Sequence, residues 1–172
     1  MAETLARITQ LQDLGMIQIR ANLAALGDVI AKAVGVGMPD QTSVSVNGNR
    51  SLCWMSHDEL LLILPKPEAA ETAAALTQAL GDSHALVVDV SDMRAAFSID
   101  GAQALQVLQK LCPADLAAMP ADGMRRTRAA QVACGVWRRE GGYVLIGFRS
   151  VGDYLRGLLQ TAARAGTQLD PR

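Results

Sequence analysis

The chain has 172 residues and a formal net charge of −1 at pH 7, and half of its residues are apolar while only 19% are charged. This balance predicts a folded protein with a large core, and it excludes a general electrostatic attraction to nucleic acid or to a membrane surface. No apolar segment approaches the roughly 18 residues that a membrane-spanning helix needs. The N-terminal sequence lacks the basic start and apolar run of a signal peptide, so we expect a cytoplasmic protein.

Three cysteines, Cys53, Cys112 and Cys134, lie far apart without paired spacing, which fits a reducing compartment. A chain of this length suits one compact domain or two small halves that share a core. Its apolar excess indicates that some surface is buried against a partner. In isolation we expect a homodimer or a larger assembly.

The first half of the chain predicts strands separated by two helices. Residues 1–13 are polar and mixed, and we expect them to form an N-terminal arm. Alternating apolar residues then predict a strand over 16–20, and Asn22 can cap the helix that follows it. The next predicted elements are a hairpin over 43–54 that turns at Asn47-Gly48-Asn49, an apolar strand over 60–64 and a helix over 67–80.

The second half centres on residues 88–116. Strands over 85–90 and 94–99 are predicted to pair with each other across a Ser91-Asp92 turn, and a helix over 102–111 ends before Pro113. The remaining predicted elements are an irregular piece over 114–119, strands over 125–132, 134–139 and 143–148, a helix over 151–163 and a flexible tail over 166–172.

This order of elements predicts an α+β fold with mixed, mostly antiparallel sheets and packed helices, in a ferredoxin-like style. We find no linker, no low-complexity tract and no close internal repeat. The expected organisation is therefore an arm (1–13), a single α+β domain (14–165) and a tail (166–172).

Cys53 and His57 stand at C-x3-H spacing around a predicted turn. Zinc needs three or four ligands, and His84 is the only other histidine. We interpret Cys53 as a core cysteine and His57 as a turn residue, and we predict neither a metal site nor a cysteine nucleophile, because Cys53 and Cys134 fall within apolar strands.

Asp89, Ser91 and Asp92 bracket the turn after a strand. One of the two aspartates could act as a general base. The favoured interpretation is that these side chains accept hydrogen bonds from turn amides, as Asp and Ser commonly do there. We therefore predict no catalytic residue in this turn.

Arginines are concentrated in the C-terminal third of the chain, and strand alternation places Arg126 and Arg128 on one face. Together with Arg138 and Arg149 they could form a patch that meets an anionic ligand or an acidic partner subunit. The alternative is a solvated sheet face. Because few aromatic residues accompany the arginines, we expect no binding of single-stranded nucleic acid.

The segment over residues 88–116 resembles the D-V-S-x-M strand–turn–strand and the G-x-x-A-x-x-x-L helix of the aminomethyltransferase (glycine-cleavage T-protein) superfamily. More narrowly, the chain resembles the gamma subunits of bacterial heterotetrameric sarcosine oxidases. Further matching pieces are Cys53-Trp54-Met55-Ser56 with Asp58-Glu59-Leu60-Leu61-Leu62, Arg126-Thr127-Arg128, Val136-Trp137-Arg138, Tyr143-Val144-Leu145 and Phe148-Arg149-Ser150 with Tyr154-Leu155.

The sequence departs from the superfamily at one decisive place. Folate-dependent members carry an acidic residue beside the pterin, whereas the comparable region here, residues 125–139, contains neither Asp nor Glu. Trp137 or Arg138 cannot replace a carboxylate that positions the pterin and assists proton transfer. The resemblance therefore implies the superfamily's fold without its active-site acid.

The resemblance implies a non-catalytic subunit of a complex that oxidises sarcosine and passes a one-carbon unit to tetrahydrofolate. FAD, FMN, NAD and tetrahydrofolate would be bound by the alpha, beta and delta partner subunits, and this chain would hold no cofactor. Two alternatives are a stand-alone aminomethyltransferase-like enzyme and a folate-binding or folate-sensing protein.

Overall fold

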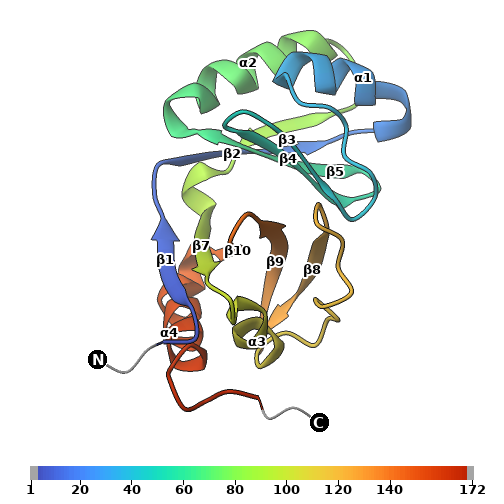
Figure 1. The fold of residues 1–172 in the computed structure, drawn as a ribbon. Coiled ribbons are helices and arrows are strands. Elements are labelled where there is room, and N and C mark those ends of the chain that lie inside the picture. The colour runs from blue at the N-terminus through green and yellow to red at the C-terminus, as the bar shows by residue number, and fades with distance from the viewer. Residues whose placement is uncertain (1–3, 170–172) are drawn as a thin grey trace. The chain divides into compact units, whose positions relative to one another are not determined.

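The computed structural model describes residues 4–169 (Figure 1). The chain divides into two compact units: residues 1–12 and 92–172 form unit 1, and residues 13–91 form unit 2. Each unit contains a five-stranded sheet and its own apolar core. Over the described residues, no helix combines the length and the apolar character needed to cross a membrane.

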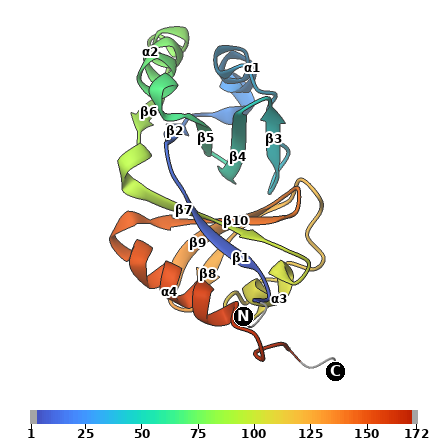
Figure 2. The same cartoon turned by 60° about the vertical axis from the view of Figure 1, so that its left-hand side comes forward.

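Unit 2 is built on an antiparallel sheet in the order β3-β4-β5-β2-β6. Its helices α1 and α2 lie side by side on one face of that sheet (Figure 2). The elements are β2 (Leu14–Arg20), α1 (Leu23–Val34), β3 (Val44–Asn47), β4 (Arg50–Ser56), β5 (Glu59–Pro65), the 3-10 turn η1 (Lys66–Glu68), α2 (Ala69–Leu80) and β6 (Leu86–Asp89).

Local signals explain the boundaries of α1. The side chain of Asn22 accepts a hydrogen bond from the amide of Ala25 and so caps the first turn of the helix. At the other end Gly35 adopts a left-handed conformation (φ 71°) and donates its amide to Ala31. The predicted cap and helix are confirmed. The hairpin at Gly48, the buried strand β5 and the helix after Pro67 are confirmed as well.

The core of unit 2 lies between its helices and its two central strands. Ile17 and Ile19 on β2 are completely buried, as are Leu60 and Leu62 on β5. They pack in one cluster with residues of both helices, which are Ile30, Val34, Leu76 and Leu80. Burying such side chains contributes about 2 kcal/mol each, so this layer stabilises the unit.

Unit 1 repeats the same plan with different segments. Its antiparallel sheet has the order β1-β7-β10-β9-β8, and α3 and α4 contribute to one core with the central strands. The elements are β1 (Arg7–Leu11), β7 (Arg94–Asp100), α3 (Ala104–Gln109), β8 (Met124–Ala129), β9 (Val132–Arg139), β10 (Gly142–Phe148), the 3-10 turn η3 (Arg149–Val151) and α4 (Gly152–Ala162).

The two units share one topology, which the sequence did not indicate. Unit 2 follows the order β2-α1-β3-β4-β5-α2-β6, and unit 1 follows β7-α3-β8-β9-β10-α4. The last strand of unit 1 is supplied by β1 from the N-terminus, because β1 pairs with β7 as β6 pairs with β2. Without β3 and β8, each sheet has the ferredoxin-like arrangement, so the predicted fold class is confirmed.

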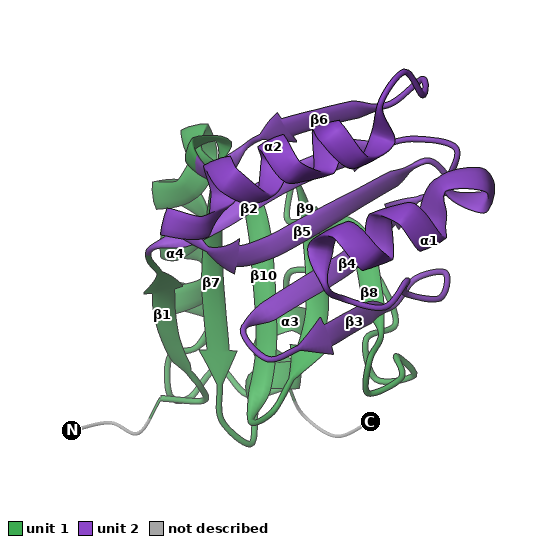
Figure 3. Ribbon diagram, turned by 90° about the horizontal axis from the view of Figure 1, so that it is seen from above, with its two compact units in different colours: residues 1–12, 92–172 green, residues 13–91 purple. Residues whose placement is uncertain are grey.

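The predicted pairing of the strands before and after Ser91 is wrong. β6 pairs with β2 in the sheet of unit 2, whereas β7 pairs with β1 and β10 in the sheet of unit 1 (Figure 3). The 3-10 turn η2 (Ser91–Met93) joins the two strands. The segment that resembled a hairpin is the point at which the chain passes from one unit to the other, because each strand finds its partners within its own unit.

Described residues of the expected arm and of the expected tail make contacts within unit 1. The segment expected to be an arm contains the edge strand β1, and Leu5 is buried and donates its amide to Ala163. In the expected tail, Thr167 accepts a hydrogen bond from Lys110, and the amide of Leu169 donates to Gln106. Residues 1–3 and 170–172 lie outside the described residues. The range expected to be a single domain, 14–165, is divided between the two units.

Gly142 offers a test of the packing of unit 1. A Cβ atom at this position would lie 2.0 Å from the backbone oxygen of Ile99, whereas a Cβ at Gly157 on α4 would meet nothing within 4 Å. We expect Gly142→Ala to lower the free energy of unfolding by about 3 kcal/mol. The control Gly157→Ala should raise it by up to about 1 kcal/mol. Urea denaturation followed by circular dichroism measures both, and equal stabilities would contradict the close approach.

Candidate functional site on the β8–β9 hairpin

Arg126 and Arg128 occupy one face of the edge strand β8. Both side chains are exposed, and the register places them opposite Gly135 and Ala133 of β9, whose side chains are small or absent. Arg125 points to the other face of the strand, where it is half-buried and donates to the backbone oxygen of Met124 at 2.9 Å. The guanidinium groups of Arg126 and Arg128 therefore stand on the same side of the hairpin.

Arg138 lies on the opposite face of the sheet and has a structural role. Its Nη2 atom donates to the backbone oxygens of Leu116 and Ala117 at 3.3 and 3.1 Å. The guanidinium carbon stands 5.8 Å from the centroid of the Tyr143 ring, within the range of a cation–π contact. Arg138 thus attaches the irregular segment before β8 to the sheet, a role that the sequence did not indicate because these partners are more than 20 residues away.

Arg149 follows β10 at the end of the sheet where Arg128 also lies. Its Nη2 atom is 3.6 Å from Oδ1 of Asp92, and both side chains are more than 60% exposed. Water screens such a pair strongly. Nearby, Arg94 stacks over the ring of Phe148 at 4.6 Å. Of the four arginines predicted to form a patch, the structure places Arg126 and Arg128 on one face and Arg149 at the same end of the sheet, and it places Arg138 elsewhere.

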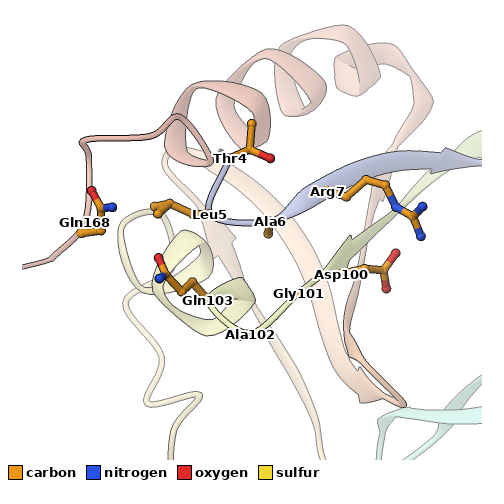
Figure 4. A pocket seen from close by; sticks show the side chains of 9 residues that line it. All are labelled: Thr4, Leu5, Ala6, Arg7, Asp100, Gly101, Ala102, Gln103 and Gln168. Carbon is orange, nitrogen blue, oxygen red and sulfur yellow. The ribbon is translucent and has the colours of Figure 1, made fainter. Parts of the chain in front are cut away.

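A polar cavity of about 410 Å³ lies at the other end of β7, and no residue predicted as a site lines it (Figure 4). Its polar side chains are those of Thr4, Arg7 of β1, Asp100 of β7, Gln103 and Gln168. Oδ2 of Asp100 accepts a hydrogen bond from Ser98 at 2.7 Å, and Oδ1 lies 3.3 Å from Nη2 of Arg139. The carboxylate is therefore held within unit 1 by its own neighbours.

Asp89 and Ser91 satisfy backbone groups at the end of β6. Oδ1 of Asp89 accepts hydrogen bonds from both the amide and the hydroxyl group of Ser91. The hydroxyl oxygen of Ser91 in turn accepts from the amide of Met16 at 2.9 Å. These contacts attach the end of β6 to β2, which is the turn chemistry favoured by the sequence.

Cys53 and His57 do not form a joint site. Cys53 is completely buried on β4, and this burial raises the pKa of its thiol to about 12. The side chain of His57 is 89% exposed in the β4–β5 turn, 3.9 Å from Asp58. In the part of the chain that the structure describes, no three His, Cys, Asp or Glu side chains are grouped as ligands of a metal ion.

The different roles of the arginines can be separated by substitution. We expect Arg138→Ala to lower the free energy of unfolding by about 2 kcal/mol, because two hydrogen bonds from a charged donor to backbone oxygens are lost. The matched control Arg128→Ala, on the exposed face, should change it by less than about 0.5 kcal/mol. Thermal or urea unfolding of both variants measures these changes in the free energy of unfolding. A stable Arg138→Ala protein would show that the contacts to Leu116 and Ala117 contribute little.

Comparison with known proteins identifies relatives of the whole fold. The family model described as "Sarcosine oxidase, gamma subunit family" matches residues 20–165. The sarcosine oxidase subunit gamma of Corynebacterium sp. (strain P-1) is 47% identical over 90 residues, which cover 51% of this chain and 43% of that protein. The subunit gamma of Arthrobacter sp. is 36% identical over 89 residues, with the same coverage. The alignments therefore span less than half the length of these curated relatives.

Two solved structures share the fold. A chain of the heterotetrameric sarcosine oxidase from Corynebacterium sp. U-96, solved in complex with pyrrole 2-carboxylate, matches with a TM-score of 0.86 and 24% identity, over 97% of this chain and 88% of that chain. The glycine cleavage system aminomethyltransferase T from Bartonella henselae matches with a TM-score of 0.69 and 13% identity, over 90% of this chain and 45% of that one. With a family model that extends from β2 to the residues after α4, this chain belongs to the sarcosine oxidase gamma subunit family.

Proposed function

We propose that this chain is a non-catalytic subunit of a heterotetrameric sarcosine oxidase complex. The observation that carries the proposal is the family match over residues 20–165. The solved chain from a heterotetrameric sarcosine oxidase supports it, because it has nearly the same extent and fold. The role of the chain in such a complex would be structural, in assembly beside the subunit that holds the folate domain.

The residues of the β8–β9 hairpin support a non-catalytic role. The sequence from Met124 to Arg139 contains neither Asp nor Glu, and the exposed face of β8 carries guanidinium groups. A pterin ring needs a carboxylate to receive hydrogen bonds from its N–H groups and to assist proton transfer. These residues do not fit a pterin, so no step of the reaction is assigned to this chain.

The complex would convert sarcosine, O2 and tetrahydrofolate to glycine, H2O2 and methylene-tetrahydrofolate, as a step of sarcosine catabolism in the cytoplasm. FAD, FMN, NAD and tetrahydrofolate would then be bound by the alpha, beta and delta partner subunits. These cofactors and subunits are what the resemblance to the gamma subunits implies, and the match to a chain of a heterotetrameric sarcosine oxidase supports the presence of partner subunits.

Arg126 and Arg128 are the part of the chain best suited to meet a partner. Both are exposed on an edge strand, with small side chains opposite them, so an acidic surface could approach the guanidinium groups closely. Arginine is enriched at protein interfaces, where its planar donor group binds carboxylates in a bidentate manner. We propose that these two residues contact an acidic surface of a partner subunit.

A stand-alone folate-binding or aminomethyltransferase-like protein is the alternative. The structural match to an aminomethyltransferase over 90% of this chain favours it. However, this chain covers only 45% of that enzyme, and the acid-free hairpin disfavours folate binding.

The two functions are separated by calorimetry and co-purification. We expect the isolated chain to show no heat of binding with tetrahydrofolate, and we expect a tagged chain to retain flavin-containing subunits when it is co-expressed with the neighbouring reading frames. The yellow colour and the flavin absorbance of the retained fraction measure the second outcome. Tight binding of tetrahydrofolate by the isolated chain would overturn the scaffold role.

The proposed contact is tested by charge reversal. We expect the double variant Arg126→Glu/Arg128→Glu to weaken retention of the partner subunits by about tenfold, with a larger loss at low salt than at high salt. The control Arg164→Glu reverses an exposed charge in the segment after α4 and should leave retention unchanged. Equal retention by both variants would place the interface elsewhere.

A further inference from the structure

The strand β6 is an open sheet edge of unit 2 that carries apolar side chains. In the order β3-β4-β5-β2-β6 it has a neighbour on one side only, and Figure 3 shows it at the margin of the purple sheet. Leu86 and Val88 are 48% and 38% exposed. Val87 between them packs against the cluster that includes the helices, so Leu86 and Val88 share the face of β6 that points away from α1 and α2.

The other edge strands of the two sheets are more polar than β6. β8 contains three arginines, β1 contains an arginine beside Thr9 and Gln10, and β3 contains a serine and an asparagine. Charged side chains on an edge strand oppose its pairing with a further strand. β6 has the sequence LVVD, and the carboxylate of its one charged residue, Asp89, accepts from Ser91 within unit 2. The edge formed by β6 is therefore the least protected against pairing.

The pairing of β6 with β2 determines which backbone groups of β6 point outward. The amide of Val90 donates to the oxygen of Met16 at 2.7 Å, and the register of the two strands continues regularly from there to Leu86. Hydrogen-bonded and non-hydrogen-bonded pairs alternate along an antiparallel ladder. Leu86 and Val88 therefore direct their N–H and C=O groups to β2. The N–H and C=O groups of Val87 face the open side, as do those of the residues two positions before and after it.

We propose that β6 is a docking edge for a second copy of this chain, whose own β6 pairs with it antiparallel about a two-fold axis at Val87. The amide of Val87 in each copy then donates to the Val87 oxygen of the other copy, and Ala85 pairs in the same way with Asp89 of the other copy. These are the residues whose backbone groups face the open side. The homodimer that the apolar composition led us to expect would thus be formed through β6.

The apolar side chains of β6 complement one another in this register. Leu86 of each copy lies opposite Val88 of the other, in a non-hydrogen-bonded pair, where side chains approach most closely. All four side chains stand on the same face of the joined sheet and cover one another. The two copies of Asp89 lie at opposite ends of the paired strands, roughly 14 Å apart at about 3.4 Å per residue. A second copy supplies all of these matches by symmetry, which favours it over a strand of unrelated sequence.

Helix α2 adds surface to this contact. A stable interface buries at least about 1,000 Å² in total, more than two strands of four residues supply, and α2 lies over the sheet on the side of β6 (Figure 2). Its Ala75 lines a surface hollow together with Ala33 of α1. Helical spacing therefore directs Ala70, Ala74 and Thr77, which are all exposed, away from α1. The two-fold axis places α2 of both copies on the same face, where these small side chains permit a close approach.

Sedimentation equilibrium of the full chain over a range of concentrations is the first test. We expect the mass to rise with concentration from 18.2 kDa to twice that value and then to stay constant, because a two-fold contact is closed by one partner. Hydrogen exchange followed by mass spectrometry locates the contact, since the peptide that carries Val87 should exchange more slowly as the concentration rises. A mass of 18.2 kDa at every concentration would overturn the proposal.

Charge substitutions test the register. Leu86→Lys/Val88→Lys places lysines opposite lysines and should raise the dissociation constant of the dimer by about a hundredfold or more. Leu86→Glu/Val88→Glu should have the same effect. An equimolar mixture of the two variants should form the dimer again, because lysines then lie opposite glutamates. The control Val46→Lys changes a side chain on the edge strand β3 that is 66% exposed, and it should leave the dissociation constant unchanged.

Circular dichroism shows that each variant is folded before it is sedimented. If a variant does not fold, the exchange measurement on the unaltered chain still decides, and exchange near Val87 that is the same in monomer and dimer would contradict the contact. Dimers that persist in both charge variants would also overturn it. So would an unaltered chain that stays monomeric while Leu86→Lys/Val88→Lys loses partner subunits, because β6 would then bind another subunit. The pairing of two copies is independent of the proposed role in a sarcosine oxidase complex, which is measured by subunit retention.

Discussion

The antiparallel pairing of β7 with β10 is the constraint on which unit 1 depends. Seven residue pairs join the strands, from Gly142–Asp100 to Phe148–Arg94. This register directs Phe97 and Leu145 into the core shared with the helices, and a slip of one residue would turn both side chains to the other face. Because β9 pairs with β10 and β8 pairs with β9, the same register also determines where the arginines of the hairpin point.

The alternation of side chains along the hairpin places Arg138 on one face of the sheet and the exposed Arg126 and Arg128 on the other. Arg138 faces the helices and donates to the segment before β8, while Arg126 and Arg128 stand exposed on the other face. Their strand contains no carboxylate. A surface of this kind suits recognition of an acidic partner better than it suits acid–base chemistry, which is the basis of the role in assembly that we propose.

The repeated topology of the two units explains how a short chain builds this fold. In unit 2 the edge strand β6 pairs with β2, the first strand of that repeat. In unit 1 the edge strand β1 pairs in the same way with β7, and β1 comes from the N-terminal part of the chain. The core residues of the two repeats differ, since the interactions that preserve the topology are apolar alternation and strand pairing rather than particular side chains.

The sequence by itself determined the helices, most strands and the fold class, because caps, turn residues and apolar spacing act over a few neighbouring positions. Asn22, Gly35 and Gly48 are examples. Strand partners lie far apart in the chain, so only the tertiary structure showed that β6 and β7 belong to different sheets and that the N-terminal residues form β1. The same reason applies to the site. The alternation of Arg126 and Arg128 is local and predictable, whereas the contacts of Arg138 with Leu116 and Ala117 depend on how distant segments pack.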